Sequence, residues 1–267
     1  MASSLWLAAL SFATVQICLP AVAAQSTPPS SGLLADTGQA PPGAQKPPAP
    51  VITPEMRGDI FMAEKRYLEA AEMYRENSNG SAVMLNKTGI AYHQIPQQLN
   101  LAEKYYRLAL RANPQYAEAV NNLGTIYYAK KSYRRAVNQY KKALRINDQS
   151  AAVWSNLGMG YFARKDYGHA AESFQRALML DSEVFERRNT QGVLLQDRSV
   201  EEHAKFHYYR AREYAKAGVK DRALQNIRKA LEEGYKEKNK MLADPAFAAL
   251  KDLPEFKELV ALEPRVL

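Results

Sequence analysis

The sequence predicts an all-α fold in which antiparallel helix pairs stack into a solenoid. Three observations support this prediction. A pattern of small and aromatic residues recurs with a period of 34 residues, and a constant period of this size indicates stacked structural units. Within each period, these residues follow one another at helical spacing. The single cysteine, Cys18, lies in an apolar N-terminal stretch, so the folded part must rely on helix packing rather than on disulfides or cysteine-bound metals.

Residues 1–24 are predicted to be a secretory signal peptide. The apolar run that starts at Leu5 ends in small residues at 21–24, which a signal peptidase accepts, although no Lys or Arg precedes it. We therefore expect an exported protein, either periplasmic or secreted. An uncleaved leader would instead anchor the protein in a membrane, but Pro20 and several polar residues argue against a stable membrane span.

Residues 25–50 are predicted to be a disordered linker. This segment is rich in Pro, Ala, Ser and Gly, and it contains no aromatic residue. Such a composition cannot bury enough apolar surface to offset the entropy lost on ordering. We expect it to behave as a flexible, partly extended spacer.

Residues 51–183 carry the clearest repeats. The Asn-Leu-Gly run at 122–124 recurs at 156–158, and the same shift relates Tyr140 to Phe174. The glycines fall in helix interiors, where glycine costs about 1 kcal/mol relative to alanine. We therefore expect a neighbouring helix to approach each glycine closely, and large rings to fill the remaining space.

Three further repeats keep part of this pattern. Two of them lie before residue 122, and one lies after residue 200. In the last one alanine replaces the glycine, and residues 184–200 interrupt the period as an irregular connection. Residues 201–267 are predicted to hold this final helix pair and a cap, because Pro245 and Pro254 each start a short helical pattern. The matching positions are Gly58, Phe61, Ala70 and Tyr74; Gly89, Tyr92, Ala102, Tyr106, Ala109 and Pro114; and Ala211, Tyr214, Ala223, Ile227 and Ala230.

These residues resemble the tetratricopeptide repeat (TPR) family. The segment 154–161 has the family's spacing of Trp, Leu-Gly and Tyr, and Ala170 and Phe174 follow at the expected positions. Asp181 and Ser182 stand where a proline often closes the repeat. The resemblance implies a right-handed superhelical solenoid with short C-terminal capping helices. It also implies a non-catalytic scaffold that binds a segment of a partner protein or a peptide in a concave groove.

In this family the first helices of successive repeats line the groove. Helical spacing then predicts a mixed surface of amide, aromatic and thioether groups, suited to an extended backbone and apolar anchors. Some relatives bind a C-terminal carboxylate through a clamp of Lys, Arg and Asn, but Lys87 is the only cation near these positions. The predicted groove residues are Asn86, Ile90, His93, Glu118, Asn121, Thr125, Tyr128, Ser155, Met159 and Phe162.

A second candidate surface is basic. The formal net charge is +8, and five cations recur at helical spacing away from the predicted packing positions of one second helix. We expect them on the convex, outer face, where they form either a solvated surface or a site for anionic lipid or cell-wall polymer. This alternative describes an envelope-associated structural protein; nucleic acid is not an expected partner of an exported protein. The five residues are Arg134, Arg135, Lys141, Lys142 and Arg145.

Catalytic motifs are not apparent in the sequence. His203 and His207 are one helical turn apart, but Ala204 stands where a zinc-protease motif needs glutamate. An enzyme would need a site formed by these histidines or by the irregular residues 191–198. We therefore expect no metal, no cofactor and no enzymatic activity. The identity of the partner and the oligomeric state do not follow from the sequence.

Overall fold

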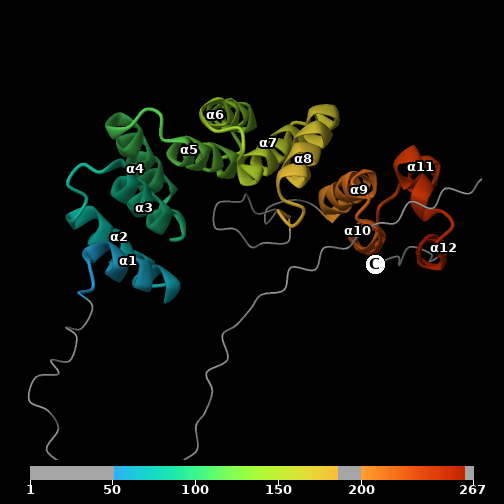
Figure 1. The fold of residues 1–267 in the computed structure, drawn as a ribbon, viewed down its shortest axis with the longest axis horizontal. Helices are drawn as coiled ribbons and strands as arrows, with labels where there is room; N and C mark the ends of the chain where they lie inside the picture. Colours follow the sequence, from blue (N-terminus) through green and yellow to red (C-terminus); the bar gives the residue numbers. More distant parts are fainter. Residues whose placement is uncertain (1–50, 186–199, 262–267) are drawn as a thin grey trace, which may run out of the picture. The chain divides into compact units, whose positions relative to one another are not determined.

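The computed structural model describes residues 51–185 and 200–261, and within these ranges every regular element is a helix (Figure 1). The predicted leader, the linker and almost all of the irregular connection lie outside the described residues. The helices are α1 (Pro54–Ala63), α2 (Tyr67–Glu76), α3 (Ala82–His93), α4 (Leu99–Ala112), α5 (Ala117–Ala129), α6 (Tyr133–Ile146), α7 (Ala151–Ala163), α8 (Tyr167–Leu180), α9 (Val200–Lys216), α10 (Lys220–Glu232), α11 (Lys238–Ala243), the 3₁₀ helix η1 (Pro245–Leu250) and α12 (Pro254–Ala261).

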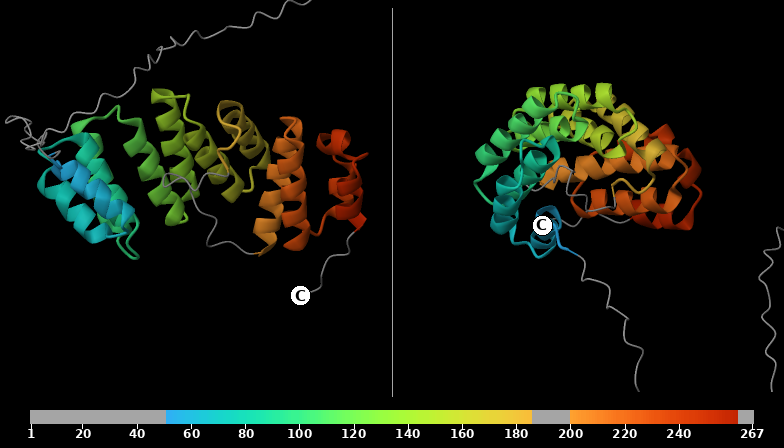
Figure 2. Two further views of the ribbon diagram at one scale, coloured as in Figure 1. Left: turned by 60° about the horizontal axis from the view of Figure 1, so that its bottom comes forward. Right: turned by 60° about the vertical axis from the view of Figure 1, so that its left-hand side comes forward.

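Consecutive helices pack as pairs, and each pair packs on the next one along the chain (Figures 1 and 2). We number these pairs as repeats: α1–α2 is repeat 1, α3–α4 repeat 2, α5–α6 repeat 3, α7–α8 repeat 4 and α9–α10 repeat 5. All of them belong to the compact unit Pro50–Leu267. The predicted fold class, a TPR-like helical solenoid with short helices at its C-terminal end, is confirmed.

The repeated glycines bring the two helices of each repeat into close contact. A Cβ atom added to Gly158 would lie 2.4 Å from Cε1 of Phe174, and one added to Gly124 would lie 2.6 Å from Cε1 of Tyr140. Both rings are fully buried. The structure therefore gives the physical reason for the glycine–aromatic pattern: the ring of the second helix lies on the bare backbone of the first.

Substitution of Gly158 by valine is expected to destabilise the protein by about 2 kcal/mol, because the buried Phe174 ring cannot move away from the new side chain. A matched substitution, Gly168→Ala, is expected to have the opposite sign. Gly168 lies exposed in the first turn of α8 with no atom within 4 Å of an added Cβ, so alanine should stabilise by about 0.5 kcal/mol. Urea unfolding of both variants measures the difference, and equal effects would contradict this account of the glycine pattern.

The turn inside most repeats has one conformation. In repeats 1, 3 and 4 the middle residue of a three-residue turn is a lysine with positive φ: Lys65 at 61°, Lys131 at 57° and Lys165 at 63°. The residue that follows donates its N–H back to the first helix, as from Ser132 to the Tyr127 carbonyl at 2.8 Å. This is the left-handed helix ending that usually favours glycine, and in repeat 5 glycine does occupy it, at Gly218.

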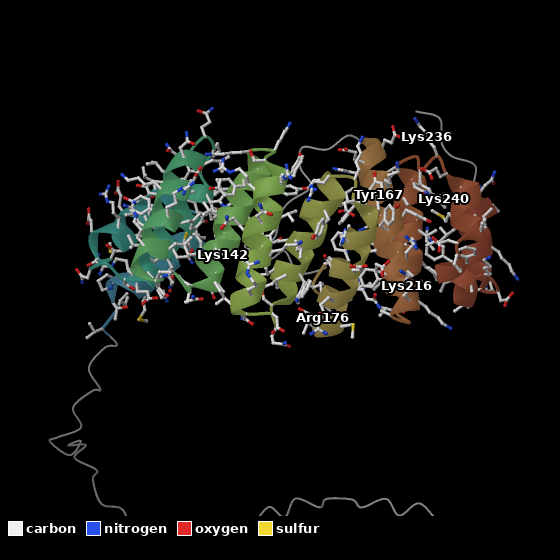
Figure 3. All side chains as sticks on the ribbon, turned by 90° about the horizontal axis from the view of Figure 1, so that it is seen from above. Lys142, Tyr167, Arg176, Lys216, Lys236 and Lys240 are labelled. Carbon is white, nitrogen blue, oxygen red and sulfur yellow. The ribbon has the colours of Figure 1, made fainter. Side chains whose placement is uncertain are left out.

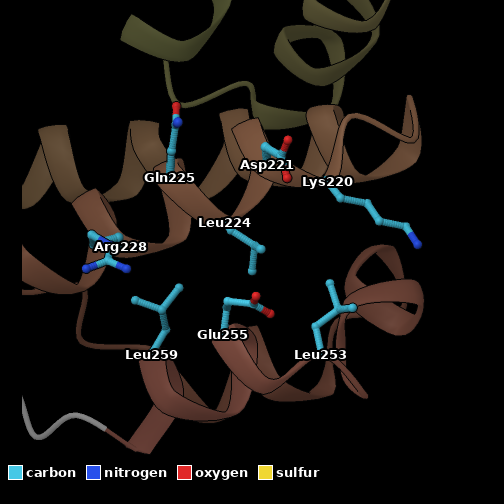
Figure 4. A pocket seen from close by; sticks show the side chains of 8 residues that line it. All are labelled: Lys220, Asp221, Leu224, Gln225, Arg228, Leu253, Glu255 and Leu259. Atoms are coloured by element: carbon cyan, nitrogen blue, oxygen red, sulfur yellow. The ribbon is translucent and has the colours of Figure 1, made fainter.

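The C-terminal helices cover repeat 5. Met241, Phe247, Leu250, Phe256 and Leu259 are all buried there. Pro245 and Pro254 start helices as predicted, although the first helix is 3₁₀, and α11 precedes them both. A hollow of about 350 Å³ remains between α10 and α12. Figure 4 shows Leu224 facing Leu253 and Leu259 across it. No helix in 51–185 or 200–261 is both long enough and apolar enough to cross a membrane.

Candidate binding surfaces

Six of the ten predicted groove residues are buried, so the expectation that these six side chains are exposed in a groove is wrong. Asn86 and Asn121 are each 1% exposed. Among the ten, Glu118 is exposed and Ile90, His93 and Ser155 are partly exposed. The six buried members of the predicted set are Asn86, Asn121, Thr125, Tyr128, Met159 and Phe162.

The buried asparagines are used between the first helices of successive repeats. Asn122 donates from Nδ2 to Oδ1 of Asn86 at 3.0 Å, and Asn156 donates in the same way to Asn121 at 3.0 Å. Within α5, Asn121 Nδ2 also donates to Asn122 Oδ1 at 3.3 Å. Buried amides must find partners, and here the neighbouring helix supplies them. Asn122 and Asn156 were not among the predicted site residues, although their 34-residue spacing marks them as equivalent positions.

The aromatic residues of the predicted groove are packing residues too. The Tyr128 ring lies 5.2 Å from that of Tyr133 on the partner helix α6. Phe162 meets Phe206 and Tyr209 of α9 with ring centroids 5.5 and 5.9 Å apart. Phe162 therefore joins repeat 4 to repeat 5. The sequence could not separate these two roles, because a ring at this helix position suits a groove and a helix interface equally well.

Lys87, the one Lys or Arg in α3, α5 and α7, is already neutralised. Its Nζ lies 2.7 Å from Glu55 and 2.8 Å from Asp59, both on α1. Burial by itself raises the pKa of Asp59, but hydrogen bonds from Lys87 and Tyr74 outweigh that effect and lower it. Lys87 therefore joins repeat 1 to repeat 2, in agreement with the conclusion that a carboxylate clamp is incomplete here.

The five cations of α6 lie on the surface of that helix. All are exposed, whereas Ala136, Tyr140 and Ala143 are buried on its other side. Two of the cations rest on aromatic rings of first helices: the Arg135 guanidinium lies 4.2 Å from the Tyr127 centroid, and the Lys141 ammonium lies 5.5 Å from the Tyr161 centroid. Both distances lie within the range of cation–π attraction, and the planar Arg135 guanidinium is the closer of the two.

Cations from a second helix also converge on this region. A cavity of about 550 Å³ lies between α4, α5 and α6, and it is lined by Arg107, Leu110, Arg111, Leu123, Tyr127, Gln139 and Lys142. Arg107 and Arg111 lie on α4 and were not among the predicted basic residues, all of which lie on α6. The shift of 34 residues that relates them to Lys141 and Arg145 was the signal that could have found them.

The histidine pair of α9 does not form a metal site in the part of the chain that the structure describes, where no cluster of three or more His, Cys, Asp or Glu side chains could hold an ion. His207 Nδ1 is 3.0 Å from Asn226 Oδ1, and Nε2 is 3.6 Å from Glu233. Burial lowers the pKa of His207 to about 4 and raises that of Glu233. The imidazole of His207 is thus neutral at neutral pH, and it packs between α9 and α10.

This environment makes the stability of the protein depend on pH. Because the pKa of His207 is 6.5 in the reference state and about 4 in the fold, its contribution is complete above the higher value and is lost as the pH falls toward the lower one. We expect a loss of about 2 kcal/mol from this group. Urea unfolding across that range measures it, and His207→Gln should show a smaller loss. An identical pH dependence in both proteins would contradict the assignment.

Comparison with known proteins identifies the repeats. The family described as "TPR repeat" matches residues 124–159, and the family described as "Tetratricopeptide repeat" matches residues 151–183. No curated protein sequence matches the chain. These two matches cover most of repeat 3 and all of repeat 4, where the sequence pattern is most regular.

Several solved structures are similar to the chain at low identity and low TM-score. A crystal structure of MamA is 19% identical and covers 68% of this chain and 95% of its own, with a TM-score of 0.46. MamA from Desulfovibrio magneticus RS-1 is 16% identical and covers 66% and 90%, with a TM-score of 0.46. YrrB, described as a TPR protein with an unusual peptide-binding site, is 17% identical and covers 68% and 84%, with a TM-score of 0.43. The identification rests on the two family matches and the period, not on these structures.

Proposed function

Because this chain is a tetratricopeptide repeat protein, we propose that it is a non-catalytic scaffold that binds a segment of a partner protein. The observation that carries the proposal is the stack of five helix pairs. Stacked repeats present long, continuous surfaces built from equivalent positions of successive helices. Such a surface suits an extended segment of another protein, which can contact several repeats at once.

The accessible part of the first helices is the proposed contact surface. It comprises Val83 and Ile90 on α3, Glu118 on α5 and Ser155 on α7, all of which are exposed or partly exposed. Val83, at 44% exposure, was not part of the predicted groove. The side chains of Val83 and Ile90 can pack against an apolar side chain of the partner. Glu118 and Ser155 can accept hydrogen bonds from the backbone N–H groups of the bound segment.

Site-specific photocrosslinking tests this surface. A photoreactive residue at Glu118 or at Ser155 is expected to capture one and the same partner protein in the native cell envelope. A photoreactive residue at Leu68 serves as the control, because that side chain is 54% exposed on α2, the second helix of repeat 1. Capture of this partner from Leu68 alone, or from none of the three positions in a folded protein, would overturn the proposal for the first helices.

We also propose that the protein acts outside the cytoplasm, after cleavage near Ala24. The support is the apolar run with small residues at its end. Mass spectrometry of the N-terminal peptide from fractionated cells tests it. A mature N-terminus near Gln25 in the periplasmic or secreted fraction is expected, and an N-terminus at Met1 in the cytoplasmic fraction would contradict export.

A further inference from the structure

The cavity between α4, α5 and α6 has the composition of an anion-binding pocket. Three of its lining side chains are cations, namely Arg107, Arg111 and Lys142, and no carboxylate lines it. Among the described residues, neither Arg111 nor Lys142 has a hydrogen bond or an ion pair. Two of the three positive charges in this pocket are therefore left without a counter-charge from the protein.

Arg107 is held in position at the edge of this pocket. Its Nη2 donates to Glu103 Oε1 at 2.8 Å and to the Tyr127 hydroxyl at 2.7 Å. The same hydroxyl accepts a second hydrogen bond from Arg135 Nη2 at 3.2 Å. Arg107 and Tyr127 are thus ordered before any ligand arrives, so their side chains lose little additional freedom on binding.

The pocket also has an apolar part. Leu110, Leu123 and the Tyr127 ring lie beside the three cations, and the Gln139 amide completes the lining. A phosphate or a sulfated sugar would meet the cations but would leave these apolar groups without a matching partner. A carboxylate next to an apolar side chain matches both parts, and the Gln139 amide can donate to the same carboxylate.

The same chemistry recurs one repeat further along the chain. A shift of 34 residues takes Arg107 to Lys141, Arg111 to Arg145 and Lys142 to Arg176. Figure 3 shows Lys142 on α6 and Arg176 on α8. The shift also preserves the other lining positions as polar or apolar: Leu110 becomes Leu144, Leu123 becomes Leu157, Tyr127 becomes Tyr161 and Gln139 becomes Ser173.

The ring stacking is preserved as well. Arg135 lies over Tyr127 at 4.2 Å, and His169, which occupies the equivalent position, stacks on Tyr161 with centroids 5.0 Å apart. Lys141 approaches this second ring at 5.5 Å. Two successive repeats therefore present cations around a tyrosine that is fixed by a stacked neighbour.

From this arrangement we infer that the second-helix surface of repeats 2 to 4 is a separate binding site for an acidic protein segment in which carboxylates alternate with apolar residues. One carboxylate binds among Arg107, Arg111 and Lys142, and its apolar neighbour contacts Leu110, which is partly exposed beside them. A longer segment extends to Lys141, Arg145 and Arg176. This site goes beyond the proposed groove, because none of its residues belongs to that surface.

Fluorescence anisotropy with purified full-length protein and synthetic peptides tests the site. The first probe is a labelled ten-residue peptide in which Glu and Leu alternate, and the second has Ser in place of every Leu. The double variant Arg111→Glu with Lys142→Glu should bind the first probe about tenfold more weakly than the unchanged protein at low salt. The Ser probe should bind the unchanged protein less tightly than the Leu probe does.

A matched control separates the pocket from general charge attraction. The variant Lys251→Glu with Lys257→Glu changes the net charge equally at two exposed positions in the C-terminal cap, and it should bind the first probe like the unchanged protein. The milder pair Arg111→Gln with Lys142→Gln should lie between the two. Thermal unfolding confirms that each variant is folded. An equal loss in the cap variant, or equal binding of the Leu and Ser probes, would overturn the inference.

A further arm uses vesicles of phosphatidylglycerol in place of the peptides. Vesicle binding that depends on Arg111 and Lys142 while the Leu probe fails to bind would assign the pocket to a membrane surface and overturn the peptide assignment. The groove proposal is tested independently, because photocrosslinking from Glu118 and Ser155 does not involve these cations. Crosslinking from the first helices together with no binding of the Glu-Leu peptide would refute only the second site.

Discussion

Replacement of Phe174 by alanine is expected to lower the free energy of unfolding by about 3 to 5 kcal/mol, as for other large aromatic residues in closely packed cores. The ring is fully buried. It makes edge contacts with Phe185 and Phe206, with centroids 5.5 and 5.8 Å apart, and it lies over the backbone at Gly158. The substitution therefore opens a cavity inside repeat 4 and also weakens its interface with repeat 5.

Equilibrium unfolding in urea measures this effect through the midpoint of the transition. Met179→Ala is the matched control, because it also removes a large apolar side chain from α8 but at a position that is 70% exposed. We expect the control to change stability by less than about 0.5 kcal/mol. Similar effects at the two positions would mean that the glycine–ring contact does not hold repeat 4 together.

The second large effect is expected at Asp244, which joins the C-terminal cap to α9. Its Oδ2 lies 2.8 Å from Arg212 Nε and accepts a hydrogen bond from the Tyr208 hydroxyl. Its Oδ1 accepts from the Ala246 N–H at 3.0 Å, at the start of η1. Asp244 is 7% exposed, so Asp244→Ala leaves a guanidinium and a phenol without this partner and should cost about 3 kcal/mol.

Asp244→Asn preserves the shape and part of the hydrogen bonding, so it is expected to cost less than the alanine variant. Asp252→Ala is the control for removing an acidic residue from the cap, because Asp252 is exposed. Hydrogen exchange measures where the protein opens: the amides of α11, η1 and α12 should lose protection first in Asp244→Ala. Unchanged protection in these helices would show that the cap is held by its apolar side chains alone.

The repeat pattern was sufficient to predict the helix pairs because their packing depends on residue size at fixed spacing. Gly158 against Phe174 and Gly124 against Tyr140 are local pairs within one repeat. The distance between the two residues of each pair depends on the turn that joins the two helices. This turn has the same conformation in repeats 3 and 4. The helix α11 was not predicted, because only six residues form it and no period extends that far.

The candidate site was harder to predict because exposure depends on neighbours that are remote in the sequence. The side-chain amides of Asn121 and Asn86 could bind a peptide backbone, but each of them accepts a hydrogen bond from an adjacent first helix instead. Asn156 donates to Asn121, and Asn122 donates to Asn86. Conversely, Arg111 had no local feature that marked it as functional. It gains a candidate role only because α6 places Lys142 beside the same cavity.

Residue size and period along the chain are enough to specify a stack of antiparallel helix pairs, with rings on glycines and a cap at the C-terminal end. Those features arise within a helix or between two consecutive helices, where spacing translates directly into contact. The division of polar and aromatic residues between packing and exposed surface arises between repeats. It depends on how closely Asn122 approaches Asn86, and on which cations of α4 and α6 meet. Such distances result from three-dimensional packing, so the accessible surfaces of this protein became visible only in its folded structure.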